Sequence, residues 1–217
     1  ALRGLSPDEI GVLASPRMAN EDLFALRRVL ERLGIAQVAF RVPPATPGSQ
    51  DDFLIRADKN PNTRGAELIG PDGDARAILA AARAGRLRCL WIFHHDLFAS
   101  AWPAAEVREA LERAGTVIFQ GTNANATSAL AHHWLPAAAW AERDGTFTNF
   151  QGRVQRFRTA IEPLGEALPE WDILGRILRG LGEDPAASRA EHWFRALARS
   201  VPAFAGMTYQ TIGDGGQ

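Results

Sequence analysis

The sequence contains a single cysteine, Cys89, among its 217 residues. One thiol rules out an internal disulfide, and it rules out an iron–sulfur cluster held by four cysteines of this chain. Cys89 lies in the apolar segment RLRCLWIF, where we expect a buried thiol without chemical function. The chain is therefore neither a disulfide-stapled scaffold nor, by itself, an iron–sulfur protein.

Long hydrophobic runs and an excess of charge of one sign are also missing. No window approaches the roughly 18 consecutive apolar residues of a membrane-spanning helix, and the first residues, ALRGLSPDEI, lack the apolar core of a signal peptide. The 24 basic and 25 acidic residues give a net charge of -1, which offers no electrostatic footprint for nucleic acid or an anionic membrane. These absences predict a cytoplasmic protein with no nucleic-acid partner and no direct membrane insertion.

Apolar segments of strand character alternate with segments of helical periodicity. A hydrophobic content of 46% allows a sizeable core. The strand candidates are residues 9–14, 37–40, 88–93, 116–120 and, shorter, 133–135. The helix candidates are residues 20–33, 74–84, 103–114, 170–181 and 188–200, with a proline-rich loop at 41–50 and a frayed glycine-rich tail at 208–217. This rhythm predicts a parallel sheet flanked by helices.

Three loops follow the predicted strands at the edge where a parallel sheet binds ligands. In such sheets the ligand lies beyond the carboxyl ends of the strands, where loops present unpaired polar groups. The loops are Ser15–Arg17, His94–Asp96 and Gly121–Asn123. The sequence therefore places any ligand-binding cleft at this edge.

The segment AERDGTFTNFQGRVQRF, residues 141–157, has the most particular order of residue types. Asp144 and Gly145 form a turn dipeptide, and the β-branched and aromatic residues 146–148 favour a strand. A second turn candidate at 149–152 precedes residues 153–158, in which arginines alternate with apolar side chains. The pattern predicts a hairpin-like ribbon. From the residues alone, the simplest interpretation is a solvated hairpin whose arginines maintain solubility.

Preceded by Leu135-Pro136, this ribbon resembles the E-x-G-T-x-x-N-x-E-G-R-x-Q signature of the molybdopterin oxidoreductase superfamily. That superfamily includes the cluster-bearing subunit of NADH-quinone oxidoreductase (NADH dehydrogenase, respiratory complex I) that is related to the molybdenum enzymes. The matching residues are Glu142, Gly145, Thr146, Asn149, Gly152, Arg153 and Gln155, with Gln151 where the family usually has glutamate. Further similar segments occur in the family's order: residues 15–34, residues 51–70 with their N-P-N-x-x-G-A-x-x-x-G pattern, and VIFQG at 117–121 ahead of A-x-x-x-LP. The resemblance covers most of residues 10–181.

The resemblance implies an α/β fold with a Rossmann-like, mostly parallel sheet flanked by helices, a short β-ribbon and C-terminal helices. It implies a molybdopterin-oxidoreductase-type domain over residues 1–160 and a helical extension over 161–217 packed on it. Two departures concern positions that the resemblance places beside the cofactor. The chain reads HHDL where the family has G-x-N-P, and His132 replaces the aspartate of A-D-V-V-L-P. Both favour the complex I branch, in which the molybdenum cofactor is generally absent.

The main functional hypothesis is a cluster-free, C-terminal part of a protein like this complex I subunit. Such a segment would have a scaffolding role in an electron-transfer enzyme and no catalytic residue or cofactor of its own. The parent protein would carry iron–sulfur clusters. Its partners would be other domains of the same subunit and neighbouring respiratory-complex subunits, at the cytoplasmic face of the inner membrane. The pairs His94-His95 and His132-His133 are not expected to bind a metal, because adjacent side chains point to different faces.

Two alternatives stay open. A fragment of a formate-dehydrogenase-like enzyme would bind molybdopterin guanine dinucleotide, and a stand-alone module would bind a nucleotide or another small ligand through Arg17 and the histidine pair. The candidate cofactor-binding residues lie in the loop after the fourth strand and in the ribbon: Gly121, Thr122, Asn123, Gly145, Thr146, Asn149, Arg153 and Gln155.

Overall fold

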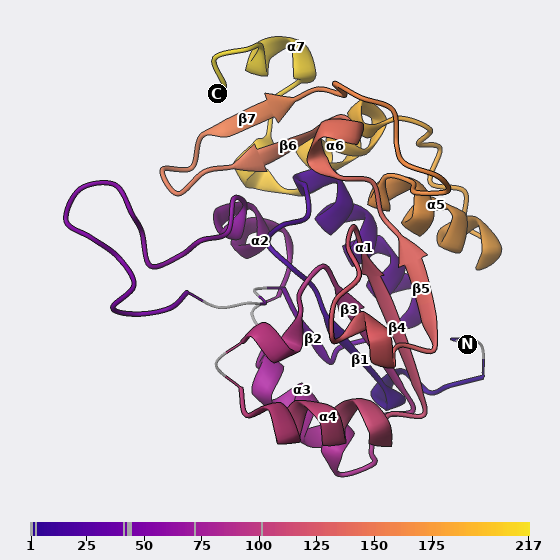
Figure 1. The fold of residues 1–217 in the computed structure, drawn as a ribbon. Coiled ribbons are helices and arrows are strands. Elements are labelled where there is room, and N and C mark those ends of the chain that lie inside the picture. The colour runs from indigo at the N-terminus through magenta and orange to yellow at the C-terminus, as the bar shows by residue number, and fades with distance from the viewer. Residues whose placement is uncertain (1, 3, 41, 43–44, 72, 101) are drawn as a thin grey trace.

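A five-stranded parallel sheet forms the centre of the molecule (Figure 1). The computed structural model describes residues 2, 4–40, 42, 45–71, 73–100 and 102–217. The sheet has the order β2-β1-β3-β4-β5, and every neighbouring pair is parallel. Its strands are β1 Ile10–Leu13, β2 Val38–Ala39, β3 Cys89–Phe93, β4 Thr116–Gly121 and β5 His133–Pro136. The predicted fold class is confirmed.

Helices cover both faces of the sheet. Successive side chains of a strand point to opposite faces and so contact different helices. On β3, Cys89, Trp91 and Phe93 pack toward α1, α5 and α6, whereas Leu90 and Ile92 pack toward α3 and α4. The helices are α1 Asn20–Leu33, α2 Thr63–Ile69, α3 Ala75–Arg83, α4 Ala104–Arg113, α5 Glu170–Gly180, α6 Ala190–Ser200 and α7 Tyr209–Ile212. An interior strand buried on both faces accounts for the unbroken apolar run that the sequence shows here.

The ends of the helices follow the signals in the sequence. Helix α1 stops at Gly34, whose φ of 70° is the left-handed conformation that glycine adopts without a Cβ clash. Helix α3 starts after Asp74, whose side chain accepts hydrogen bonds from the amides of Arg76 and Ala77. The short helix α2 was not predicted, because its first residues follow an Asn-Pro-Asn turn sequence. Of the predicted loop at 41–50, residues 41, 43 and 44 lie outside the described residues.

The predicted ribbon is an antiparallel hairpin of β6, Gly145–Thr148, and β7, Val154–Phe157. The prediction of a frayed tail was wrong. Val154 and Gln217 exchange backbone hydrogen bonds of 2.7 and 2.9 Å, and Tyr209 and Ile212 of α7 are buried. The tail is ordered because Gln217 forms hydrogen bonds with the backbone of β7 along the edge that does not pair with β6.

The helices after residue 160 share a hydrophobic core with the sheet. Leu174 of α5 and Trp193 of α6 belong to the same buried cluster as Val12 of β1. The proposed division of the chain into 1–160 and 161–217 stays a prediction. Within the described residues, no helix combines the length and apolar character needed to cross a bilayer.

The strand order fixes where a ligand would enter. From β1 the chain moves outward to β2 and then returns to the other side of β1 to form β3. The loops that leave the carboxyl ends of β1 and β3 therefore diverge to opposite sides of the sheet. In open α/β sheets this switch point leaves a crevice that is the usual place for a ligand.

A glycine of the N-P-N-x-x-G-A-x-x-x-G segment provides a test of the packing. A Cβ on Gly70 would lie 2.1 Å from Cδ1 of Phe40, whereas Gly180 at the end of α5 has no such neighbour within 4 Å. We expect Gly70→Ala to lower the free energy of unfolding by about 1–3 kcal/mol through overpacking. Gly180→Ala should change it by less than about 1 kcal/mol. Equal urea midpoints for the two variants would contradict this packing.

Candidate functional site

The switch point between β1 and β3 brings together loops that the sequence predicted to bind a ligand. Arg17, from the loop after β1, is exposed and has no ion pair among the described residues. Its charge acts on His95, from the loop after β3. Burial, and then the charge of Arg17, lower the pKa of His95 to about 4. At neutral pH the site therefore contains a guanidinium without an ion pair among the described residues, beside a neutral imidazole.

Two buried polar side chains at this edge have atoms without a hydrogen-bond partner within the described part of the chain. The Nε2 atom of His95 lies 2.5 Å from Oγ of Ser100, but its Nδ1 atom has no hydrogen bond, although the residue is only 5% exposed. Gln120 is fully buried near the end of β4, and both Oε1 and Nε2 are unpaired. Since buried polar groups are nearly always hydrogen-bonded, a ligand or water bound at this edge would satisfy these atoms.

His94 has a backbone conformation that explains the family's usual glycine. Its φ is 55°, a region that non-glycine residues seldom adopt. Its Nε2 atom contacts a carboxylate oxygen of Glu170, and its side chain is 7% exposed. The neighbouring Asp96 accepts hydrogen bonds from the amide and hydroxyl of Thr127 at 3.2 and 2.9 Å. These contacts hold the loop after β3 against α5 and against the loop after β4.

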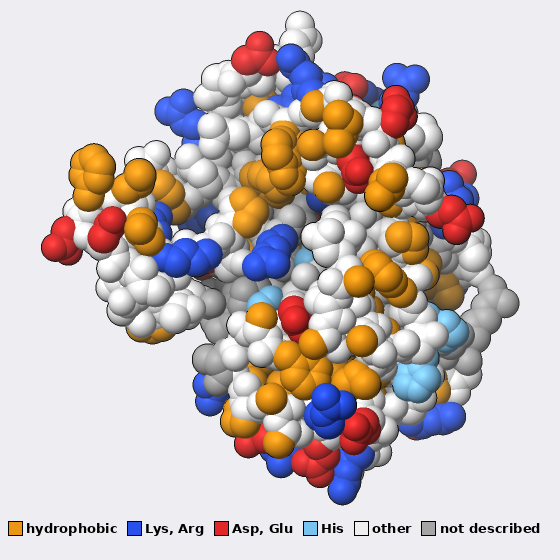
Figure 2. Space-filling view, viewed as in Figure 1, with side chains coloured by type: hydrophobic (Ala, Val, Ile, Leu, Met, Phe, Trp, Pro, Cys, Tyr) orange, Lys and Arg blue, Asp and Glu red, His pale blue; other side chains and the backbone are white. Residues whose placement is uncertain are grey.

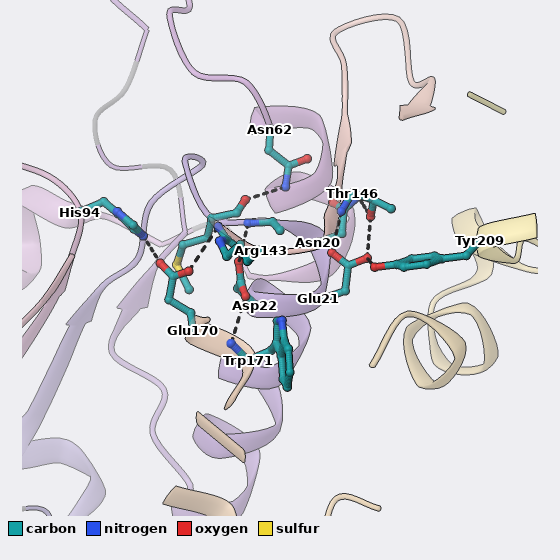
Figure 3. A network of polar contacts seen from close by, with 12 residues as sticks. Asn20, Glu21, Asp22, Asn62, His94, Arg143, Thr146, Glu170, Trp171 and Tyr209 are labelled. Carbon is teal, nitrogen blue, oxygen red and sulfur yellow. Dashed lines mark hydrogen bonds and ion pairs between the residues drawn. The ribbon is translucent and has the colours of Figure 1, made fainter. Parts of the chain in front are cut away.

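A buried ion network extends from His94 into the protein (Figure 3). Arg143, 2% exposed at its side chain, contacts Oδ2 of Asp22 and lies 3.2 Å from Oε2 of Glu170; both carboxylates are fully buried. Asp22 also accepts the amides of Ala19 and Trp171 at 2.8 and 3.0 Å. Arg143 and His94 lower the pKa of Glu170 against the opposing effect of burial. One guanidinium thus joins α1, α5 and the segment that leads into β6.

Glu21, the neighbour of Asp22 on α1, holds the hairpin and the C-terminal helix. Its carboxylate accepts the amide and hydroxyl of Thr146 at 2.8 and 2.9 Å and the hydroxyl of Tyr209 at 2.8 Å (Figure 3). Burial raises the pKa of Glu21 to about 7, although the amide of Thr146 opposes the rise. The amide of Thr146 points away from β7, so Glu21 satisfies an edge of the hairpin that would otherwise be unpaired.

Two asparagines complete that edge. Asn20 donates to the hydroxyls of Thr146 and Thr148 at 3.0 and 3.1 Å, and Asn62 accepts the amide of Thr148 at 2.7 Å. A Cβ on Gly65 would lie 2.1 Å from Oδ1 of Asn20 and 2.2 Å from Oδ1 of Asn62. The side chains of Asn20 and Asn62 therefore pack directly against the backbone of α2 at Gly65, where no side chain would fit. This packing explains both Asn62 and Gly65 in the segment at 51–70.

The structure brings the predicted ribbon residues together. Gly145 and Thr146 are buried in β6, and a Cβ on Gly145 would lie 2.5 Å from the ring of Phe157. Oδ1 of Asn149 accepts the amides of Gln151 and Arg153 at 3.0 Å, and Nδ2 of Asn149 lies 3.5 Å from Oε1 of Gln155. Arg153 also donates to the carbonyl of Gly215. Much of the signature therefore serves to shape the hairpin and its turn.

The other predicted group lies apart from the ribbon. Gly121 is buried at the end of β4, and Thr122 and Asn123 are exposed in the following loop. No hydrogen bond between described residues joins these three residues to Gly145, Thr146, Asn149, Arg153 or Gln155. A role for either group in cofactor binding stays a prediction.

Sequence reasoning missed the buried network because charged residues inside a protein leave no periodic signal. Asn20 and Glu21 were noted only as a polar helix start, Arg143 only as a charge before a turn, and Glu170 only as the start of a helix. The available signal was the run Asn20-Glu21-Asp22 at the start of an otherwise core-facing helix, where acidic side chains are favoured by the helix dipole.

The histidines of each pair face different surroundings, as their adjacency predicts. His94 contacts Glu170, whereas His95 contacts Ser100. Nδ1 of His132 accepts the amide of Val117 at 2.9 Å, and His133 is exposed on β5. The described residues contain no group of three or more side chains placed to hold a metal ion.

The buried ion network provides a test based on stability. Arg143→Leu leaves two fully buried carboxylates without their cation, so we expect a loss of about 3–5 kcal/mol in the free energy of unfolding. Arg158→Leu is the matched control, because Arg158 pairs with Asp214 at the surface. This variant should lower the free energy of unfolding by less than about 1 kcal/mol. Urea unfolding of both variants measures the difference, and similar losses would show that the network does not hold the fold together.

Glu21 provides a test based on pH. Because its pKa of about 7 in the folded state exceeds the ordinary value of 4.5, the folded state retains a proton that the unfolded chain releases between these pH values. Its contribution is complete below about pH 4.5 and is lost as the pH rises through 7. The wild type should therefore lose about 3 kcal/mol relative to Glu21→Gln over this range. A difference in stability that is independent of pH would contradict the assignment.

Comparisons with known proteins find related sequences. A family model for molybdopterin oxidoreductase matches residues 60–179. An F420-dependent formate dehydrogenase 2 subunit alpha of Methanococcus maripaludis is 39% identical over 109 residues, which are 49% of this chain and 16% of that protein. A putative formate dehydrogenase of Bacillus subtilis is 30% identical over 174 residues, which are 79% of this chain and 18% of that protein.

The fold also matches a solved structure. Acetylene hydratase from Pelobacter acetylenicus superposes with a TM-score of 0.54 over 91% of this chain and 24% of that chain, at 15% sequence identity, a likeness that concerns the fold alone. The chain spans less than a quarter of the length of each of these proteins. Because the family model covers more than half of its residues, the chain belongs to the molybdopterin oxidoreductase family.

Proposed function

We propose that the chain is a cofactor-binding part of a formate-dehydrogenase-like oxidoreductase, with the switch point between β1 and β3 holding part of a molybdopterin guanine dinucleotide. The observation that carries this proposal is a set of polar groups at the carboxyl edge of the sheet: Arg17, which has no ion pair among the described residues, and the unpaired buried atoms of His95 and Gln120. The similarity to curated formate dehydrogenases supports this choice over the complex I branch.

The polar groups present suit the chemistry of such a cofactor. A free guanidinium is the side chain best suited to a pyrophosphate, because its planar donors match two phosphate oxygens at once. The carboxamide of Gln120 offers a donor and an acceptor together, as the lactam edge of guanine or of a pterin requires. Neutral His95 adds an unpaired ring nitrogen without adding charge.

The residues of this chain would bind and orient the cofactor, which supplies the electron-transfer chemistry when bound. None of the described residues is assigned a catalytic role. Oxidation of formate would depend on further parts of a larger protein, because the curated relatives extend far beyond the matched region. The buried network of Arg143, Glu170 and His94 would keep the loop after β3 in place at the cofactor site.

A second function is favoured by a specific observation. His94 stands where the family has glycine, and its side chain is engaged by Glu170 at the ligand edge. This substitution supports a scaffolding segment of the NADH-quinone oxidoreductase type, in which no dinucleotide is bound. A stand-alone nucleotide-binding module would use the same edge as the first proposal, without the redox cofactor.

Binding of guanosine diphosphate to the chain distinguishes the two nucleotide-binding functions from the scaffolding function. If the switch point binds the nucleotide, a concentration of 100 times the dissociation constant should raise stability by about 2.7 kcal/mol in a thermal unfolding experiment. Arg17→Ala should weaken binding at least about tenfold, which corresponds to the loss of one charge-assisted contact. Arg86→Ala is the matched control, because Arg86 is an exposed arginine ahead of β3, at the opposite edge of the sheet.

Gln120→Leu gives an independent readout. It removes two unpaired buried atoms, so the ligand-free variant should be as stable as the wild type or more stable, while nucleotide binding weakens. Absence of any stabilisation by the nucleotide would favour the scaffolding function. Weakening of binding by Arg86→Ala as much as by Arg17→Ala would show that binding is not at the switch point.

A further inference from the structure

The loop between β2 and α2 presents an apolar tip to solvent. Phe53, Leu54 and Ile55 are 94%, 77% and 52% exposed. The loop projects from the body of the protein on the side of α2, and hydrophobic side chains gather at its outer end beside acidic ones (Figures 1 and 2). Three successive large apolar side chains at this exposure are unusual for a surface with no binding role.

The tip is held in this conformation by its own hydrogen bonds. Oδ1 of Asp51 accepts the amides of Phe53, Leu54 and Ile55 at 3.0, 2.7 and 2.6 Å, and the amide of Asp51 donates to the carbonyl of Ile55. These amide hydrogen bonds lower the pKa of Asp51. At the base of the loop, the amide of Thr46 donates to the carbonyl of Ala57. The chain therefore orders its backbone while its apolar side chains point outward.

The charges beside the tip favour a protein partner over a bilayer. Asp51, Asp52 and Asp58 outnumber Arg56 and Lys59 in this segment. A loop that enters an anionic membrane needs a basic collar, which would draw it to the lipid headgroups. An apolar tip with an acidic flank instead fits an apolar groove with a basic rim.

This chain has a groove of that kind on its opposite side. The groove has a volume of about 420 Å³ and is mainly apolar, and it is lined by Leu2, Ile118, His133, Leu135, Ile177, Gly180 and Leu181. It lies beside the edge strand β5 and helix α5, far across the molecule from the projecting loop (Figure 1).

Two arginines and one glutamate lie beside this groove. Arg32 donates to the carbonyl of Leu181 at 3.0 Å. Arg28 and Arg32 both pair with the carboxylate of Glu183. Nε of Arg32 lies 3.9 Å from Oε2 of Glu183. Tip and groove are thus complementary both in polarity and in charge.

We propose that the tip formed by Phe53, Leu54 and Ile55 docks in the β5–α5 groove of a second copy of this chain. Because the two surfaces lie on opposite sides of one molecule, the contact is head-to-tail and leaves a free tip and a free groove at the ends of each pair. Copies then add at both ends until a ring closes or a chain extends. A contact of this small size forms a weak, reversible assembly.

Sedimentation velocity over a wide range of protein concentrations tests the proposal. The wild type should form species larger than a dimer as its concentration rises. A tip variant, Phe53→Ser with Leu54→Ser, should weaken association at least about tenfold while its unfolding midpoint stays unchanged, since both side chains are exposed. Leu164→Ser is the matched control, because Leu164 is 84% exposed and outside both surfaces, and it should associate as the wild type does.

Mixing two defective variants gives the sharpest result. A groove variant, His133→Glu with Leu181→Glu, places acidic side chains where the acidic tip would bind, and it should be monomeric alone. A mixture of the tip variant and the groove variant should form dimers and nothing larger, because only one tip and one groove remain functional in each pair. A separate unfolding measurement confirms that both variants are folded.

Three outcomes would overturn the proposal. The first is a wild type that stays monomeric at the highest concentration, and the second is association that the tip variant retains. The third is binding of the wild type, but not of the tip variant, to vesicles of phosphatidylcholine and phosphatidylserine without any self-association, which would identify a bilayer as the occupant.

Discussion

The contact of Arg143 with Asp22 and Glu170 is the interaction on which the arrangement of this protein depends. Each of the three comes from a different part of the chain: α1, the segment before β6, and the start of α5. All three side chains are almost completely removed from water, so each charge requires the others. Through His94, the same contact fixes the loop after β3 at the carboxyl edge of the sheet.

The hairpin residues of the family signature could serve the fold, bind a ligand, or do both, and their contacts show the first role. Thr146 and Thr148 bind Glu21, Asn20 and Asn62, so the hairpin replaces a missing neighbouring strand with side chains of α1 and of the turn before α2. Two buried residues with unpaired side-chain atoms, His95 and Gln120, lie instead in the loop after β3 and near the end of β4. The contacts of the hairpin therefore serve the fold, while Arg17, His95 and Gln120 are the residues that we propose to bind a ligand.

The sequence predicts the parts of this structure that follow from local or periodic signals. The apolar run before Phe93 indicates a buried strand, Gly34 and Asp74 mark helix ends, and Asp144-Gly145 leads into the hairpin. It does not predict pairings between distant polar residues, such as Asp22 with Arg143 or Val154 with Gln217, because these depend on which surfaces meet after folding. The order of the strands sets the switch point, and no local pattern encodes that order. For the same reason, the three loops follow the strands as predicted and their binding of a ligand stays a prediction, whereas the unpaired Gln120 was found only in the structure.

The central claim is that the switch point, rather than the hairpin, receives a nucleotide. Backbone amide resonances of the chain, followed by nuclear magnetic resonance during titration with guanosine diphosphate, test this claim most directly. The account predicts saturable shifts at Arg17, His95 and Gly121, with Asn149 and Arg153 of the hairpin turn unaffected. Shifts centred on Asn149 and Arg153, or no shifts at any nucleotide concentration, would contradict it.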